Sequence, residues 1–172
     1  DQARTLLPAL ATEWADGRAR IVDVCGRIHA MDRDNRWERV ERAWRLYALG
    51  EGAIAATAEE AIAASYAAGV TDEFVEPVVI GEPSPIADGD EVVFLNFRPD
   101  RAREICQALA DPAFDAFDRG GGGLARLTAM TAYWDGQPGA IAFPEERPDQ
   151  VLADALECAG VPQDRKSTRL NS

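Results

Sequence analysis

The chain alternates between two kinds of hydrophobic pattern. In one, apolar residues recur every three or four positions, which predicts amphipathic helices; in the other, they form short runs that predict strands. We expect helices at about 2–15, from about residue 35, from Thr57 to Gly69, from Pro99, and at about 148–159. We expect strands at 19–25, 91–97, about 124–132 and 140–143. This alternation is typical of an α/β fold with a mixed, largely parallel sheet and flanking helices.

Two predicted helices begin with side chains that can accept hydrogen bonds from free backbone N–H groups. Asp34 or Asn35 can cap the first, and Asn35 precedes Glu38 by three residues, the spacing of a capping box. Thr57 and Glu60 show the same spacing at the second. The helix near residue 35 carries apolar side chains on one face, namely Trp37, Val40, Trp44 and Tyr47. We expect that face to pack into the core.

The segment 91–97 is a nearly unbroken apolar run. It follows Asp88-Gly89-Asp90, which predicts a turn, and Pro99 fits the first turn of the helix that comes next. Continuous apolar strands of this kind are typical of sheets that are covered on both faces. We therefore expect 91–97 to be a buried strand.

The composition is that of one acidic globular domain. The 172 residues are 47% hydrophobic and 28% charged, with a formal net charge of −12. Nucleic acids and anionic membranes require a basic surface, so this charge argues against both as partners. No apolar run is long enough for a transmembrane helix, and we recognise no secretory signal. Cys25, Cys106 and Cys158 are odd in number and widely spaced, so we expect reduced thiols in a cytoplasmic protein.

The last nine residues differ from the rest of the chain. Segment 164–172 holds the single lysine, Lys166, and two of the four serines, whereas the other basic residues are all arginine. We interpret it as a non-native tail, the translation of a sequencing adapter, and exclude it from the fold. Residues 1–163 are then expected to form a partial domain.

Four arginines stand in two short clusters, each directly after a predicted strand. Arg27 and Arg33 follow the strand at 19–25, and Arg98 and Arg101 follow the strand at 91–97. A guanidinium group presents a planar pair of donors that matches phosphate and carboxylate oxygens. If the two strands run parallel in one sheet, the clusters share one sheet edge, where α/β proteins usually bind ligands. The clusters therefore predict a site for a small, multiply charged anion.

Nearby residues support this site but also offer a simpler explanation. Arg98 and Arg101 flank a predicted helix start, which favours anions. Asp32 and Asp100 are placed to orient the guanidinium groups. The alternative is that the arginines only form surface ion pairs with neighbouring aspartates, which are common in proteins.

These segments resemble motifs of one enzyme family. Residues 26–40 resemble the G-R-x-x-A-M-D-R-D-x-R-W segment of cofactor-independent (2,3-bisphosphoglycerate-independent) phosphoglycerate mutase. Residues 96–103 resemble its N-F-R-P-D-R-A-R segment, and further motifs recur in the family's order at 71–74, 88–90, 128–131 and 142–144. The resemblance covers residues 1–163 and implies the central part of the phosphotransferase, or substrate-binding, domain of that cytoplasmic glycolytic and gluconeogenic isomerase.

The resemblance also implies a mechanism and a site. Arg27, Arg33, Arg98 and Arg101 fall on positions that hold the phosphate and carboxylate of 2- or 3-phosphoglycerate. The phosphoryl group passes to a serine of a phosphatase-like domain and returns to the other hydroxyl, with two divalent metal ions, manganese expected. The serine and the metal ligands lie outside this segment. We therefore expect a fragment of a monomeric enzyme that binds no metal and is inactive alone.

Other noticeable residues are interpreted as structural and are given no part in substrate or metal binding. The family often has two aromatic residues where this chain has Ile28 and His29, and a lone histidine is more often structural than a metal ligand. The glycine run at 120–123 lacks the spacing of a phosphate-binding loop. A non-catalytic α/β module that binds a phosphorylated metabolite, or that docks onto a partner domain, is the alternative function.

Overall fold

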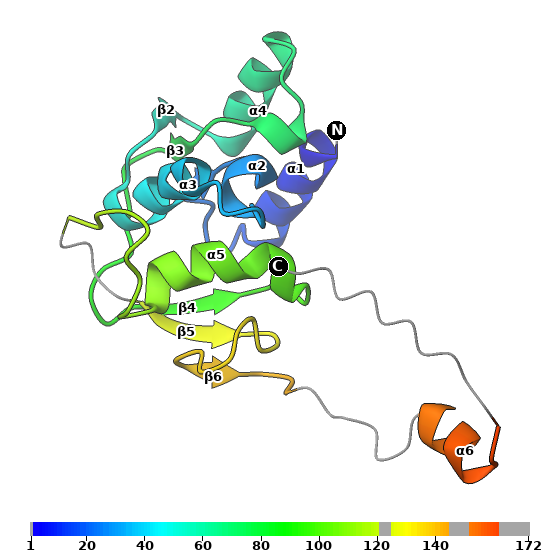
Figure 1. Cartoon of the computed structure of the whole chain (residues 1–172). Coiled ribbons are helices and arrows are strands. Elements are labelled where there is room, and N and C mark those ends of the chain that lie inside the picture. Colours follow the sequence, from blue (N-terminus) through cyan, green and yellow to red (C-terminus); the bar gives the residue numbers. More distant parts are fainter. Residues whose placement is uncertain (1, 121–124, 145–151, 162–172) are drawn as a thin grey trace.

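The computed structural model describes residues 2–120, 125–144 and 152–161. Helices and strands alternate through most of this length, and the strands form two separate sheets (Figure 1). In chain order the elements are α1 (Ala3–Glu13), β1 (Asp23–Val24), α2 (Arg27–Ala30), α3 (Trp37–Leu49), β2 (Ala53–Ala55), α4 (Ala58–Ala67), the 3-10 helix η1 (Asp72–Phe74), β3 (Val78–Ile80), β4 (Glu91–Phe94), α5 (Pro99–Ala110), β5 (Arg126–Ala129), β6 (Ala140–Ile141) and α6 (Leu152–Cys158). The expected α/β class with flanking helices is confirmed.

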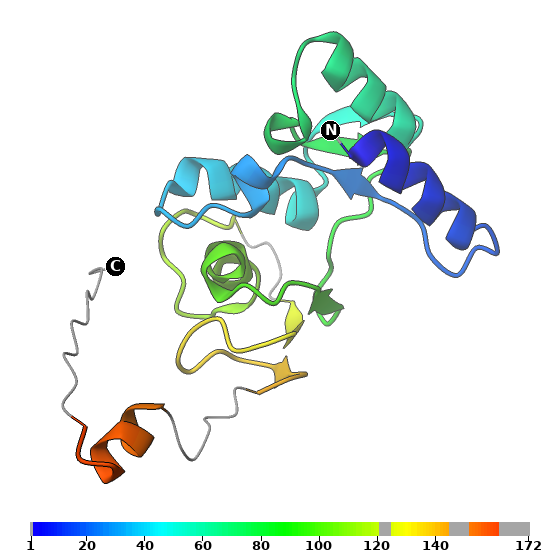
Figure 2. The same cartoon turned by 90° about the vertical axis from the view of Figure 1, so that its right-hand side faces the viewer.

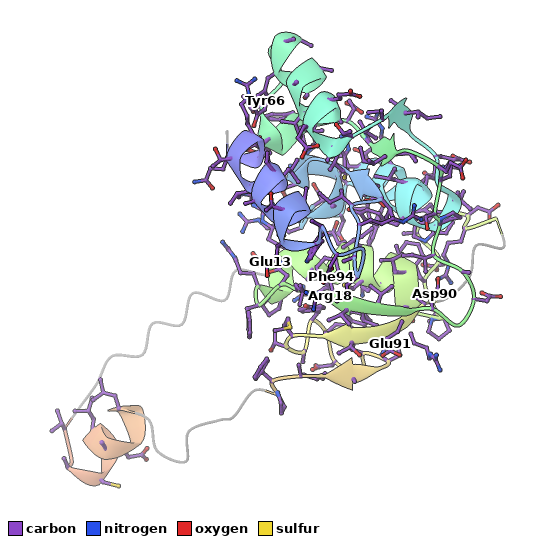
Figure 3. The ribbon with its side chains drawn as sticks, turned by 180° about the vertical axis from the view of Figure 1, so that it is seen from behind. Glu13, Arg18, Tyr66, Asp90, Glu91 and Phe94 are labelled. Atoms are coloured by element: carbon purple, nitrogen blue, oxygen red, sulfur yellow. The ribbon has the colours of Figure 1, made fainter. Side chains whose placement is uncertain are left out.

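The first sheet is small and mixed. Its strand order is β1-β3-β2, with β1 antiparallel and β2 parallel to β3. Helices α1 and α4 pack against each other beside it. Figure 3 shows Tyr66 of α4 at this helix pair, where its hydroxyl hydrogen-bonds to Asp72 and its ring lies 5.0 Å from the Arg4 guanidinium.

The second sheet is entirely parallel. Its order is β4-β5-β6, with Glu91 opposite Arg126 and Phe94 opposite Ala129 in the register of β4 and β5. Figure 3 shows Glu91 at the start of β4 and Phe94 at its end. Helix α5 covers one face of this sheet, and α3 lies on the far side of α5 (Figure 2).

The core lies between α3, α5 and the second sheet. Trp44 and Val40 of α3 are fully buried, as are Cys106 of α5 and, almost completely, Ile105 and Tyr133. The expected apolar face of α3 is therefore confirmed. Burial of these side chains is the main stabilising term for this half of the molecule, because each large apolar side chain contributes roughly 1.5–3 kcal/mol when removed from water.

Two expectations about the strands are wrong. The strands that precede the arginine clusters, β1 and β4, belong to different sheets, so the clusters do not share one sheet edge. The run 91–97 is also not covered on both faces: β4 ends at Phe94, and Val93, Leu95 and Phe97 are 55%, 80% and 62% exposed. The physical reason is that α5 covers only one side of this sheet, and the described residues supply nothing for the other.

The helix starts were predicted with mixed success. Thr57 caps α4 as expected, since its hydroxyl accepts the N–H of Glu60 at 3.2 Å. Asn35 does not cap α3: it adopts a left-handed backbone with φ of 56°, and its N–H donates to Glu104. Helix α3 begins after Arg36 without a side-chain cap, and Asp32 instead fixes the loop before it, because its Oδ1 accepts the N–H groups of Asp34 and Arg36 at 2.9 and 3.1 Å.

Further predictions concern the C-terminal part of the chain. Helix α6 lies within the expected range and stands apart from both sheets in Figures 1 and 2. The proposed non-native tail, 164–172, lies outside the described residues, as does most of the glycine run at 120–123. No helix in the described ranges combines the length and apolar character that crossing a membrane requires.

The cap at Thr57 gives a test of local stability. Thr57→Ala removes the acceptor for the Glu60 N–H, and we expect it to lower the free energy of unfolding by about 1 kcal/mol. Thr57→Ser keeps the hydroxyl and serves as the control, with a loss of less than half that size. Urea unfolding followed by circular dichroism measures both, and equal losses in the two variants would contradict the assigned hydrogen bond.

Candidate functional site

Arg98 and Arg101 are placed by the start of helix α5. Arg98 is the N-cap residue, its own N–H donates to Asn96 Oδ1 at 2.8 Å, and Pro99 occupies the first helical position. The Tyr133 hydroxyl lies 2.6 Å from the Asn96 carbonyl oxygen, to which it donates, and so fixes the backbone just before the helix. The sequence folds this way because proline suits the first turn of a helix and asparagine readily closes a turn.

Arg33 reaches the same place from the loop 31–36, which connects α2 and α3. Its Nη1 donates to Asp100 Oδ2 at 3.0 Å, while Arg98 Nε lies 3.4 Å from Asp100 Oδ1. The hydrogen bond from Arg33 lowers the pKa of the Asp100 side chain. Asp100 therefore orients two arginines that stand 65 positions apart in the sequence, as expected for this aspartate.

Arg101 joins the cluster on its buried side. Its Nη1 donates to the Met31 carbonyl oxygen at 3.0 Å, directly after α2. Its Nε is buried and has no hydrogen-bond partner among the described residues. Arg33, Arg98 and Arg101 therefore gather at the contact of loop 31–36 with α5, which we call the arginine cluster.

Arg27 is not linked to the arginine cluster by a direct contact. It is the first residue of α2, and its Nε lies 4.0 Å from Glu73 Oε1 of η1. Met31 follows the same helix, about 6 Å further along its axis. Gly26 sets the start of α2, because a side chain there would collide with the backbone of Glu73 and Val75. That all four arginines bind one ligand stays a prediction.

The expected role of Asp32 is only partly right. Asp32 does orient a guanidinium, but that of Arg36, whose Nη1 lies 3.2 Å from Oδ2, and not that of a predicted site residue. Arg39 Nη1 is 3.8 Å from the same oxygen. The sequence placed Asp32 beside Arg33, whereas the turn of loop 31–36 points the aspartate inward and leaves Arg33 45% exposed.

The arginine cluster lies at the surface. Arg98 is 69% exposed in its side chain, and Asp100 is 39% exposed. Cavities of about 250 to 500 Å³ occur elsewhere in the described part of the chain, and none of the four arginines lines them. The cluster is therefore an open patch of guanidinium groups from two chain segments.

Glu104 and Tyr133 are site residues that the sequence reasoning missed. Glu104 is buried beneath the cluster and binds the backbone of Asn35, and Tyr133 holds the segment before Arg98. Glu104 stands three positions after Arg101, on the same side of the helix. That spacing could have indicated from the sequence that Glu104 lies near the cluster. The contact of Tyr133 with the end of β4 depends on tertiary structure and has no such local indication.

His29 lies in the interior, on α2, and is 4% exposed. Its Nε2 is 3.8 Å from Glu76 Oε2, and neither ring nitrogen has a hydrogen-bond partner within the described segments. Burial lowers the pKa of His29, and the neighbouring Arg42 and Arg39 act in the same direction against Glu76. The imidazole is therefore neutral in the folded chain at neutral pH.

Metal ligands do not gather in the part of the chain that the structure describes. No group of three or more His, Cys, Asp or Glu side chains there has the arrangement of a metal site. The two-metal centre that the family resemblance implies for the complete enzyme does not fit these residues.

Fold and cluster together define an α/β domain with arginines gathered at a helix start. The family described as "BPG-independent PGAM N-terminus" matches residues 1–135. The chain therefore belongs to the 2,3-bisphosphoglycerate-independent phosphoglycerate mutase family, and the resemblance found in its motifs is confirmed.

Relatives and a solved structure agree with this assignment. The 2,3-bisphosphoglycerate-independent phosphoglycerate mutase of Idiomarina loihiensis is 46% identical over 142 residues, which cover 81% of this chain and 28% of the relative. That of Moorella thermoacetica is 46% identical over 152 residues, 86% of this chain and 30% of the relative. A crystal structure of Leishmania mexicana phosphoglycerate mutase at low cobalt concentration matches with a TM-score of 0.79 and 31% identity, over 92% of this chain and 32% of that one. The chain thus spans about three tenths of the length of these proteins.

The buried histidine predicts a dependence of stability on pH. The unfolded chain protonates His29 near its ordinary pKa of 6.5, whereas the folded chain resists protonation. The unfolded state then binds more protons, so stability contributed by neutral His29 is present above pH 6.5 and is lost as the pH falls below it. We therefore expect the free energy of unfolding to fall as the pH is lowered from 7.5 to 5.5.

The comparison with His29→Phe isolates this effect. Phenylalanine keeps an aromatic ring in the buried position and cannot be protonated. Urea unfolding of both proteins at the two pH values gives the change in unfolding free energy with pH for each. Other titrating groups contribute equally to both changes, so the difference between them is due to His29. A pH dependence that is the same in His29→Phe would contradict a neutral, buried imidazole.

Proposed function

We propose that this chain is the part of a 2,3-bisphosphoglycerate-independent phosphoglycerate mutase that holds the phosphate and carboxylate of 2- or 3-phosphoglycerate. Arg27, Arg33, Arg98 and Arg101 are the binding residues in this proposal. The observation that carries it is the convergence of Arg33 and Arg98 on Asp100 at the first turn of α5. Family membership supports the enzyme class.

The charge balance of the arginine cluster favours an anion. Arg33 and Arg98 share the single carboxylate of Asp100, while Arg101 binds the uncharged Met31 carbonyl oxygen, so the positive charges of the cluster outnumber the carboxylate that binds them. A chain with a net charge of −12 repels anions at long range, so this local excess is what attracts a phosphorylated acid. The free N–H groups at the start of α5 add donors to the same place.

The role of the arginines is to position the substrate. Bidentate guanidinium bonds fix both the distance and the orientation of a phosphate or carboxylate group. In a reaction that moves a phosphoryl group away and back, they retain the glycerate while it turns and prevent its escape to water. Arg98 and Arg33 are exposed enough to change partner from Asp100 to a ligand oxygen without unfolding the helix.

The phosphoryl acceptor is supplied by the rest of the enzyme in this proposal. Ser65 donates its hydroxyl hydrogen to the Val70 carbonyl oxygen at the end of α4, remote from the arginine cluster in sequence and in fold. A phosphatase-like domain contributes the nucleophilic serine and two divalent metal ions, with manganese expected. The chain alone then binds the substrate weakly and does not interconvert the two phosphoglycerates. The complete enzyme is proposed to be a cytoplasmic monomer of glycolysis and gluconeogenesis.

Replacement of Arg98 tests the proposal in an active enzyme. A hybrid is made in which this chain's segment replaces the matching 142-residue stretch of the Idiomarina loihiensis mutase. In this hybrid, Arg98→Ala removes charge-assisted hydrogen bonds to the substrate. We expect kcat/KM to fall by about two to three orders of magnitude, or about 3–4 kcal/mol. A coupled assay that consumes 2-phosphoglycerate measures the rate.

The matched control is Arg126→Ala. Arg126 has a similar exposure, 72%, but stands at the opposite end of the same sheet, where β5 begins, opposite Glu91. Its loss is expected to change kcat/KM by less than threefold. Equal effects of the two replacements, or near-normal kinetics in Arg98→Ala, would contradict the binding role. An inactive parent hybrid whose isolated chain still binds 3-phosphoglycerate would favour a non-catalytic binding module.

A further inference from the structure

Two buried carboxyl groups lie directly beneath the arginine cluster. Asp32 of loop 31–36 and Glu104 of α5 are each 4% exposed. Asp32 precedes Arg33, and Glu104 follows Arg101 by three positions. The two acids therefore stand on the two segments whose contact brings the arginines together.

Asp32 is equipped to carry a negative charge. Its Oδ1 accepts the N–H groups of Asp34 and Arg36, and its Oδ2 accepts from the Arg36 guanidinium at 3.2 Å. Burial works against the charged form, but these donors outweigh it and lower the pKa of Asp32. Arg39, from α3, adds a second cation at 3.8 Å.

The surroundings of Glu104, in contrast, favour its neutral form. Its Oε1 accepts one hydrogen bond, from the Asn35 N–H at 3.0 Å, while its Oε2 is buried without a donor. None of the ion pairs among the described residues includes Glu104. The backbone of one short loop places it near Asp32, because the Asn35 N–H donates to Glu104 while the N–H groups of Asp34 and Arg36, on either side of Asn35, donate to Asp32. Burial raises the pKa of Glu104, and the negative charges of Asp32 and Asp34 raise it further.

Two buried carboxyl groups that bind neighbouring N–H groups of one loop cannot both be ionised at low cost, so one of them keeps a proton. The donors around Asp32 assign the charge to Asp32 and the proton to Glu104. A neutral carboxyl group is a hydrogen-bond donor, which gives the otherwise unsatisfied Oε2 a partner. Bonds between a neutral acid and a carboxylate are short and strong.

We propose that Glu104 is a positioning residue: it stays neutral, donates from Oε2 to the Asp32 carboxylate, and accepts the Asn35 N–H at Oε1. The effect of Glu104 on substrate binding rests on the proposed function, whereas its protonation state does not. The two bonds hold loop 31–36 on α5 from both sides of Asp34. They keep Arg33 within reach of Asp100, where Arg98 also points. Asn35, with its left-handed backbone, is held in that conformation by the same carboxyl group.

The protonation of Glu104 predicts a specific pH dependence. The unfolded chain releases this proton near pH 4.5, the ordinary pKa of glutamic acid, whereas the folded chain retains it to higher pH. The folded state then binds more protons, so this contribution to stability is full below pH 4.5 and is lost as the pH rises through the raised pKa. The charged groups that act on Glu104 are Asp32 and Asp34 from the loop, and Arg36 and Arg39 bind Asp32 beside it. A comparison of variants cancels the titration of these groups.

Glu104→Gln is the decisive variant in the 172-residue chain. Glutamine has the same shape, keeps the acceptor for Asn35 and offers a permanent N–H donor to Asp32. The unfolding equilibrium constant of the wild type, relative to that of Glu104→Gln, is expected to rise by up to tenfold per pH unit above pH 4.5. Glu82→Gln, at an exposed loop position, is the control and should follow the wild type. A constant ratio between wild type and Glu104→Gln from pH 4.5 to 8.5 would overturn the proposal.

Carbon-13 NMR of the side-chain carboxyl groups gives a direct second measurement. The signal that disappears in Glu104→Gln is assigned to Glu104, and it should titrate at higher pH than the signals of the exposed glutamates. A Glu104 signal that titrates together with them would overturn the neutral state. This readout does not depend on substrate or on activity.

The kinetic arm uses the hybrid mutase described above. Glu104→Met keeps the volume but removes both hydrogen bonds, and we expect kcat/KM to fall about 10- to 100-fold, mainly through KM. Glu104→Gln should restore near-normal values and abolish the loss of kcat/KM that the parent hybrid shows as Glu104 ionises at high pH. If Arg98→Ala is active, the proposed function fails while the pH results above still stand. If Arg98→Ala is inactive but Glu104→Met is normal, only the positioning role fails.

Discussion

The contact of loop 31–36 with helix α5 is the interaction on which the other features of this molecule depend. Three polar bonds cross it: Arg33 to Asp100, Arg101 to the Met31 carbonyl, and the Asn35 N–H to Glu104. Each joins residues 67 to 70 positions apart, and the loop leads into α3, whose apolar face packs on α5. The same contact connects the half of the chain with the first sheet to the half with the second. The arginine cluster exists only where these halves meet.

Apolar and polar contributions have different tasks at this contact. Trp44 and Ile105 are buried between α3 and α5 and provide the favourable free energy. Apolar packing alone tolerates small shifts, whereas hydrogen bonds have narrow limits of distance and angle. The bonds around Asp32 and Glu104 therefore set the exact position of loop 31–36. Their burial makes any mismatch costly, because an unpaired polar group in the interior loses its water without a replacement.

The sequence predicted those parts of the site that local chemistry determines. Pro99 and the run before it indicated the start of α5, and Asp100 next to Arg101 indicated an orienting carboxylate. Features that depend on tertiary packing were not accessible. The run 91–97 reads as a fully buried strand, yet its far face is open, because apolar content says nothing of which elements cover it. Asn35 is a residue type that often caps helices, but Glu104 binds its N–H and its backbone is left-handed, so α3 begins without a side-chain cap. The separation of β1 and β4 into two sheets likewise leaves no local signal.

The open arginine cluster and the uncovered side of the second sheet have a common explanation. The chain spans about three tenths of the length of its relatives, so most of the polypeptide that surrounds this segment in those proteins is not present here. An anion on an exposed patch is weakly held, because water and salt screen the guanidinium charges. In the proposed enzyme, closure of another part of the polypeptide over this patch would lower the local dielectric constant and strengthen the same bonds. Under that proposal the arginines, held by buried carboxyl groups, orient the anion, and the remainder of the enzyme encloses it.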